Sequence, residues 1–187
     1  MVRGLDIFIS TIRSHTELKE NSIKLIKRFI IDSGCPSIKF ENLSTRAAGI
    51  SKTDECIIST IIFGIPVEYF VYIMLHEVAH QFQYLKHGKN IALSIYQNTE
   101  INEAANKLLS LEKVADRLAI KKAREVLRLS NIHTVDKIIP RYLNLTDTSQ
   151  IKSHILDIRA QVELHGLTTI EQINNCIYNK ISVNGSA

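Results

Sequence analysis

The sequence predicts an α+β protein that is mostly helical, with a short β-sheet packed beside one long helix. Three observations support this fold class: helical apolar spacing over most of the chain, two strand-like segments confined to residues 37–63, and an order of helix, strands, then helices. With 187 residues and 45% hydrophobic content, the chain is able to bury a core. We expect a core domain at residues 1–130 and a C-terminal helical appendage at residues 131–187 that packs on it.

The first expected element is a helix over residues 15–33. Ser14 and Glu17 have the spacing of a capping box, apolar residues follow at helical intervals, and a glycine and a proline end the pattern. Residues 37–41 alternate polar and apolar side chains, which predicts a short half-buried strand. The polar stretch 42–54 is expected to be a loop.

A strand followed by a long helix is expected next. Residues 55–63 are rich in isoleucine and form the best strand candidate in the chain. Pro66 suits the first turn of a helix and Gly88 suits its C-terminal cap, so a helix is expected over residues 66–88. A membrane span across Cys56–Leu75 is not expected, because a Gly-Ile-Pro sequence divides it into a strand-like half and a helix-like half.

The remainder of the chain is predicted to be helical. Residues 99–129 have an almost continuous helical pattern, with a break expected near Ser110. Residues 147–165 begin with capping residues and end at a glycine, which predicts another helix. A second capping box precedes a last helix expected over residues 168–181.

Charge and cysteine content narrow the class of protein. The net charge of +4 is a mild basic excess, spread along the chain rather than gathered in a patch. Two short basic clusters occur, Lys24/Lys27/Arg28 and Lys121/Lys122/Arg124. We interpret both as solvated helix faces, so a nucleic-acid partner is not indicated.

Three widely spaced cysteines form no C-x-x-C pair, and Met1–Asp6 lacks the apolar core of a signal peptide. We therefore expect a cytoplasmic protein with reduced thiols and no membrane partner.

The most informative motif is His76-Glu77-Val78-Ala79-His80, an H-E-x-x-H sequence inside the predicted helix 66–88. Two histidines four positions apart project from the same helix face, so their imidazoles are able to bind one metal ion. Glu77 then lies beside that ion, where it can reach a bound water. Zinc hydrolases use this arrangement. We expect Zn²⁺ as the cofactor and Glu77 as the catalytic residue.

A catalytic zinc site needs a third protein ligand. Glu112 is the best candidate, because a helix that returns antiparallel would bring its carboxylate back to the two histidines. Glu100 and Glu103 are rivals, but neither is followed by an acidic residue four positions later. Asp116 lies one turn after Glu112 and is expected to accept the second ring N–H of a histidine ligand. His87 lies too far along the same helix to reach the ion.

The motifs at residues 76–80 and 112–116 together resemble those of a known family. His76-Glu77-x-x-His80 followed by Glu112-x-x-Ala115-Asp116 resembles the gluzincin metallopeptidases, and most closely the small ImmA/IrrE type. The metzincin pattern is rejected, because Gln83 replaces its glycine. The segment Ser37–Phe63 also resembles SprT-like proteins, which take a third histidine where this chain offers none that is suitable.

The gluzincin resemblance covers about residues 35–125 and has three implications. The core would be zincin-like, the chain would be a zinc metallopeptidase, and its substrate would be a protein or peptide, with a regulatory protein suggested by analogy. It also implies that the strand Cys56–Phe63 lies at the sheet edge and pairs with extended substrate.

The expected reaction is hydrolysis of a peptide bond. Glu77 would take a proton from the water that zinc activates and later pass it to the leaving amine. A further donor is expected to stabilise the transition state, and Tyr142 is the principal candidate. The other candidates are Tyr84, His133, His154 and His165.

Two alternatives stay open at this point. The first is a non-catalytic interaction module in which the metal is structural and the C-terminal helices bind a partner. The second is a DNA-associated protease of the SprT type, which salt-dependent binding to DNA would support. The sequence also leaves the metal open, because two histidines and a glutamate accept divalent ions other than zinc.

Overall fold

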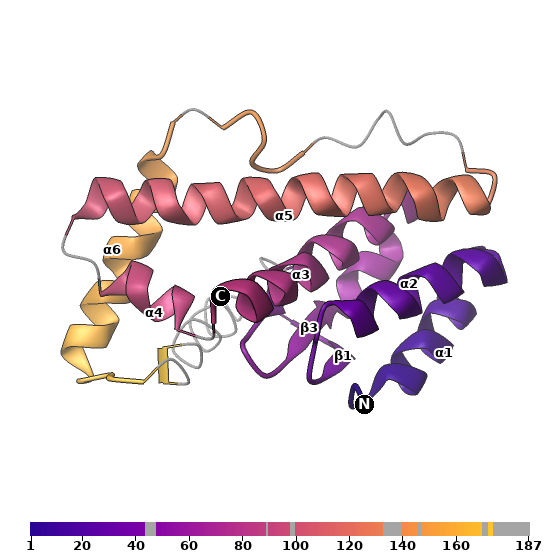
Figure 1. Cartoon of the computed structure of the whole chain (residues 1–187), viewed down its shortest axis with the longest axis horizontal. Helices are drawn as coiled ribbons and strands as arrows, with labels where there is room; N and C mark the ends of the chain where they lie inside the picture. The colour runs from indigo at the N-terminus through magenta and orange to yellow at the C-terminus, as the bar shows by residue number, and fades with distance from the viewer. Residues whose placement is uncertain are drawn as a thin grey trace.

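The computed structural model describes residues 1–43, 48–88, 90–97, 100–132, 140–145, 147–169 and 172–173. Within these residues the chain forms helices and a small sheet, which confirms the predicted α+β class (Figure 1). The helices are α1 Leu5–His15, α2 Glu20–Asp32, α3 Val67–His87, α4 Ile91–Tyr96, α5 Ile101–Leu129 and α6 Ser149–Leu164. The strands are β1 Ile38–Glu41, β2 Gly49–Ser51 and β3 Cys56–Ser59, and a 3₁₀ helix, η1, covers Thr60–Gly64.

Helix α5 extends along the length of the molecule, and the other elements lie beside it (Figure 1). Helix α3 packs against its middle, with α1, α2 and the sheet toward one end and α4 and α6 toward the other. The predicted helix 66–88 is therefore confirmed as α3. Its C-terminal cap is Gly88, whose φ of 82° is a conformation that glycine adopts without strain.

The sheet has the strand order β1-β3-β2, with β1 parallel and β2 antiparallel to β3. Two expectations about it were wrong. Residues 42–54 are not all loop, because β2 pairs with β3 through Ile50 and Ile57. The segment 56–63 does not lie at the edge either, since β3 is the central strand and the chain continues from it into η1.

The N-terminal prediction needs correction at its start: the helix expected over residues 15–33 is α2, and a further helix, α1, precedes it. Helix α1 ends at His15 and α2 begins only at Glu20. Ser14 does not begin a helix; its hydroxyl donates to the carbonyl of Thr11 in the last turn of α1. The burial of Leu5, Phe8, Ile9 and Ile12, at helical spacing, explains why α1 forms.

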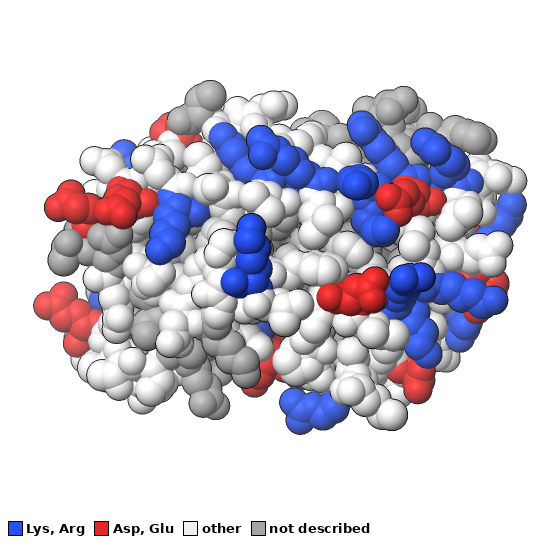
Figure 2. Space-filling model, viewed as in Figure 1, with Lys and Arg blue, Asp and Glu red and all other residues white. Residues whose placement is uncertain are grey.

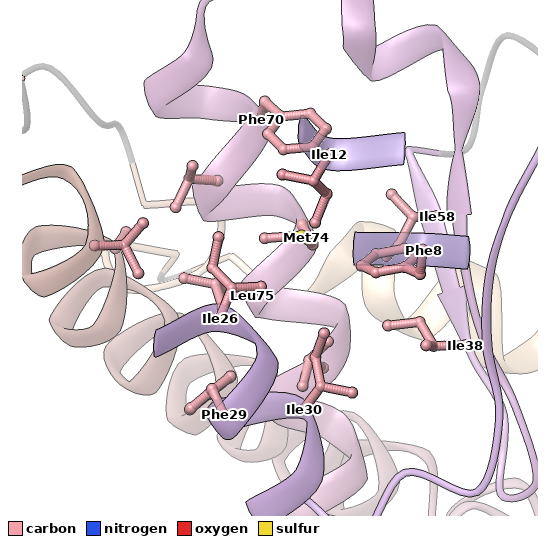
Figure 3. Packing of buried hydrophobic residues seen from close by; sticks show 14 of the residues in the cluster. Phe8, Ile12, Ile26, Phe29, Ile30, Ile38, Ile58, Phe70, Met74 and Leu75 are labelled. Atoms are coloured by element: carbon pink, nitrogen blue, oxygen red, sulfur yellow. The ribbon is translucent and has the colours of Figure 1, made fainter. Parts of the chain in front are cut away.

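Two large hydrophobic clusters hold most of the described elements together, and a third, small one joins Leu43, Ile50 and Ile57. The larger lies between α1, α2, α3, the sheet and the second half of α5, and Figure 3 shows residues such as Phe8, Ile26, Ile58 and Met74 meeting at its centre. The smaller joins α4 and the first half of α5 to α6, with Ile95, Leu109, Ile155 and Ile158 buried together. The proposed boundary between residues 130 and 131 stays a prediction.

The C-terminal half agrees in outline with the sequence patterns. Helix α5 is continuous through Ser110, so the break expected there was wrong, and the short helix α4 precedes α5. Helix α6 confirms the element expected at 147–165. Most of the helix expected over 168–181 lies outside the described residues. None of the described helices is long and apolar enough to cross a membrane.

Candidate metal centre

Helix α3 carries the H-E-x-x-H residues in its interior, and α5 lies against the face that they occupy. His76 is 1% exposed and Glu77 is 6% exposed, so neither belongs to an ordinary solvated face. Burying such polar groups is costly unless they find partners, and the partners of His76 come from α5. The two helices are able to approach closely because Ala115 and Ala119 of α5 are completely buried.

Three atoms from the two helices converge on one point. Nε2 of His76 lies 3.2 Å from Nε2 of His80 and 3.2 Å from Oε2 of Glu112. The third side of this triangle, from Nε2 of His80 to Oε2 of Glu112, measures 3.5 Å. Ligands bound tetrahedrally at about 2.0–2.1 Å are separated by roughly 3.3 Å, so the spacing fits a zinc-sized ion. These three residues form a group that can hold a metal ion.

Asp116 supports the His76 side of the group. Its Oδ1 atom lies 2.9 Å from Nδ1 of His76 and accepts a hydrogen bond of 2.6 Å from the hydroxyl of Tyr72. Its Oδ2 atom accepts from the backbone N–H groups of Tyr142 and Leu143. The approach to His76 is electrostatic rather than a well-aligned hydrogen bond. Asp116 thus joins His76 to the segment 140–145.

Gln83 supports the His80 side, a role that the sequence pattern did not reveal. Its amide nitrogen donates to the carbonyl of Leu111 at 2.6 Å, and its amide oxygen lies 3.0 Å from Nδ1 of His80. Because a carbonyl only accepts, this arrangement requires the hydrogen of His80 to be on Nδ1. Nε2 of His80 is then left with its lone pair free for the metal. A signal was present in the sequence, since Gln83 is three positions after His80 and shares its helix face.

Without a metal, the same residues form a charged cluster. Burial opposes the charge of His76, but the carboxylates of Asp116 and Glu112 outweigh burial and raise the pKa of His76 to about 9. Burial would also raise the pKa of Glu112, but the nearby His80 and His76 hold it well below its usual range. A divalent cation bound at this point would replace the protons in neutralising Glu112.

Glu77 lies next to this group, where strand β2 passes close to it. A Cβ atom at Gly49 would lie 2.5 Å from Cγ of Glu77, so only glycine allows β2 this close. On its other side, Oε1 of Glu77 lies 3.7 Å from the guanidinium of Arg141. Neither Gly49 nor Arg141 was identified from the sequence, because both lie in short segments without a periodic pattern.

A cavity of about 270 Å³ opens beside these residues. One part of its lining is polar and includes His76, Glu77, His80 and Glu112. The other part is apolar and includes Ile91, Ile95, Leu108 and Leu111 from α4 and α5. The metal-binding group therefore has one side that faces open space.

Some of the predicted transition-state donors lie at the cavity and others do not. Tyr142, Tyr84 and His154 line the cavity. The ring of Tyr142 stacks on His76 with 6.2 Å between the centroids, and burial raises the pKa of Tyr142 to about 12. The hydroxyl of Tyr84 donates to the carbonyl of Ser51. His165 caps α6 and is exposed, whereas His133 lies outside the described residues.

The rival metal ligands are not part of the group. Glu100 precedes α5, Glu103 lies in its first turn, and His87 is the last residue of α3. All three are exposed, and none belongs to the metal-binding group found among the described residues.

No protein-family model, curated protein or solved structure matches this chain. The resemblance to the gluzincins therefore stays a prediction, and a function for this chain has to be inferred from the geometry of the site.

Proposed function

We propose that this protein is a zinc-dependent metallopeptidase of the gluzincin type, in which His76, His80 and Glu112 hold the metal and Glu77 is the catalytic residue. The observation that carries the proposal is the triangle of donor atoms, with sides of 3.2, 3.2 and 3.5 Å, bordering a cavity that Glu77 also lines. Structural zinc sites are enclosed by four protein ligands, whereas catalytic sites keep one position open. The open side favours the catalytic type.

Two nitrogen donors and one carboxylate suit zinc, although other divalent ions also accept such a set. A bound zinc ion would supply Lewis acidity, polarising the substrate carbonyl and lowering the pKa of water. Asp116 and Gln83 would orient the two imidazoles through their Nδ1 atoms. The ligands are thus held in position by groups that do not themselves touch the metal.

Glu77 would move the proton. Its carboxylate borders the cavity next to the donor atoms, where it can take a proton from the attacking water and give it to the leaving amine. Arg141 lies against Oε1 of Glu77 and 39% of its side-chain surface is accessible, so it can also contact a substrate oxygen. Tyr142 is the proposed donor to the developing oxyanion, because its ring lies over His76.

The proposed substrate is a protein or peptide segment in an extended conformation. Strand β2 is an outer strand of the described sheet, and residues 49–52 line the cavity. An extended peptide that pairs with β2 would pass beside Glu77 and the metal-binding group. A regulatory protein as the natural substrate is proposed from the ImmA/IrrE resemblance alone.

Glu77→Gln tests the proposal directly. With zinc content measured by metal analysis and hydrolysis of denatured casein followed by released peptides, we expect full zinc occupancy and a rate lower by about a hundredfold or more. Glu103→Gln makes the same chemical change on an exposed helix surface and should keep both properties. Wild-type hydrolysis by Glu77→Gln would refute the role of Glu77. Full zinc occupancy in Glu112→Ala would refute the ligand set.

A further inference from the structure

Helix α5 carries a row of basic side chains on the face that points away from the core. Its members are Lys113, Arg117, Lys121, Arg124 and Arg128, and we call this set the basic row. Successive members are three or four residues apart, so on an α-helix they fall within an arc of about 80° and extend over about 22 Å. The buried alanines at 115, 119 and 123 lie on another side of the same helix.

The basic row is not the same set of residues as the sequence cluster Lys121/Lys122/Arg124. Lys122 is not a member, because it forms an ion pair of 2.6 Å with Glu125. The row also includes Lys113, Arg117 and Arg128, which lie outside that cluster in the sequence. Helical periodicity places them on the same face of α5. Lys121 and Arg124 are exposed, which agrees with the interpretation of this cluster as a solvated helix face.

The charge of the basic row is not neutralised within the described part of the chain. None of its five members forms an ion pair with a described residue, and no acidic residue falls within the arc between Lys113 and Arg128. Four members are exposed and Lys113 is half-buried. Figure 2 shows several Lys and Arg side chains over the band of the molecule in which α5 lies, with some Asp or Glu side chains beside them. Keeping five cations this close costs free energy through self-repulsion, which a polyanion would relieve.

We infer that the basic row binds the phosphate backbone of a nucleic-acid duplex without reading its sequence. Cations follow each other about every 4.5–6 Å along the helix axis, and one strand of a duplex carries a phosphate about every 3.4 Å, so several phosphates face the row at once. Three of the five members are arginines, whose guanidinium groups bind phosphate oxygens in pairs. Helix α5 contains no aromatic residue that could stack on bases, so stacking does not add to the phosphate contacts.

An anionic membrane surface is the less favoured partner. A helix that lies on a membrane needs an exposed apolar face beside its cations. The apolar face of α5 is buried against α2, α3 and α6, and its exposed large apolar residues are only Val114 and Leu129. The basic row includes none of the metal-ligating residues, so this inference is independent of the proposed peptidase activity.

The test is binding of the full chain to a fluorescently labelled DNA duplex over a range of salt concentrations. We expect the logarithm of the affinity to fall with the logarithm of the salt concentration with a slope of about −4.5, because about five phosphates are neutralised. The triple variant Arg117→Gln/Lys121→Gln/Arg124→Gln should bind about a hundredfold more weakly in low salt, with a slope smaller by about 2.7. Glutamine preserves helix propensity, so folding should be unaffected.

Arg3→Gln/Lys86→Gln is the matched control, because it removes exposed cations from outside α5. It should change affinity by less than about threefold per charge, and the wild type should bind duplexes of unrelated sequence equally. An equal loss per charge in the control and the triple variant would show that only net charge matters, and the inference would be wrong. Binding of the wild type to phosphatidylserine vesicles but not to duplex would also overturn it.

Discussion

The amide oxygen of Gln83 lies 3.0 Å from Nδ1 of His80, while the amide nitrogen of the same side chain donates to the carbonyl of Leu111. Leu111 immediately precedes Glu112. One buried side chain therefore contacts both a proposed ligand on α3 and the backbone next to a proposed ligand on α5. Asp116 performs the corresponding task for His76, so each histidine of the group has its own orienting partner.

Gln83→Leu should lower zinc affinity while the fold is kept. Leucine fills a similar volume but cannot accept the Nδ1 hydrogen of His80, so we expect a loss of about 10–100-fold in a chelator competition. Gln81→Leu is the matched control on the same helix, because Gln81 bonds to Ser51 and Lys52 rather than to a ligand. Equal zinc affinity in the two variants would contradict the orienting role.

Asp116→Ala should destabilise the fold as well as the site. It removes the acceptor of the Tyr72 hydroxyl and of two backbone N–H groups, at residues 142 and 143. Leaving such donors unsatisfied should lower the free energy of unfolding by about 3–5 kcal/mol in urea denaturation. Asp6→Ala breaks only an exposed pair with Lys27, so its effect should be below about 1 kcal/mol. A similar loss in both variants would show that Asp116 is not a structural centre.

Gly49→Ala should impair catalysis more than metal binding. The new Cβ would lie 2.5 Å from Cγ and 3.0 Å from Cδ of Glu77, so the carboxylate must move. Misplacing a catalytic group by about 1 Å reduces kcat/KM on the order of a hundredfold, whereas zinc affinity should be nearly unchanged. Gly64→Ala is the control, because a Cβ there meets nothing within 4 Å. If Gly49→Ala hydrolyses casein at the wild-type rate, Glu77 is not where the reaction occurs.

The stability of the metal-free protein should depend on pH in a defined direction. The pKa of His76 is raised from 6.5 to about 9, so its contribution is complete below pH 6.5 and is lost as pH rises toward 9. The pKa of Glu112 is lowered from 4.5, so its contribution is present above pH 4.5 and is lost as pH falls. In urea denaturation with a chelator present, these two groups should therefore add most to the free energy of unfolding between about pH 4.5 and 6.5. A stability that increases from about pH 6.5 to 9 would contradict this.

Zinc binding should show the opposite trend with pH. Because the metal competes with the proton on His76, apparent affinity should rise up to about tenfold per pH unit between pH 6.5 and 9. Proton release on zinc addition, measured by calorimetry in buffers of different ionisation enthalpy, provides the check. No release at about pH 7 would mean that His76 is already neutral in the metal-free protein.

Long periodic elements could be predicted from the sequence, and elements that depend on distant partners could not. Helix α3 is defined by its own residues, since Pro66 begins it and Gly88 ends it. Strand β2 has only three residues and exists because it pairs with β3. The start of α2 was misplaced because the Ser14–Glu17 spacing imitates a helix start, whereas Thr16 in the structure is extended.

The same distinction applies to the site. His76, His80, Glu112 and Asp116 follow helical spacing within two elements, so one helix pairing was enough to bring them together. Arg141 and Gly49 come from non-helical segments that reach Glu77 only through tertiary packing. No local pattern in the chain marks either residue.

The buried alanines of α5 have a consequence for ion selection. Ala119 and Ala123 lie in the same hydrophobic cluster as Leu75 and Val78 of α3, so small side chains of α5 pack against α3 next to the proposed ligands. A closely packed pair of helices cannot move apart easily to accept a larger ion such as Ca²⁺, which also needs about six to eight oxygen ligands at about 2.3–2.6 Å. Discrimination by ionic radius would then be a property of the hydrophobic core, encoded in residues that never contact the metal.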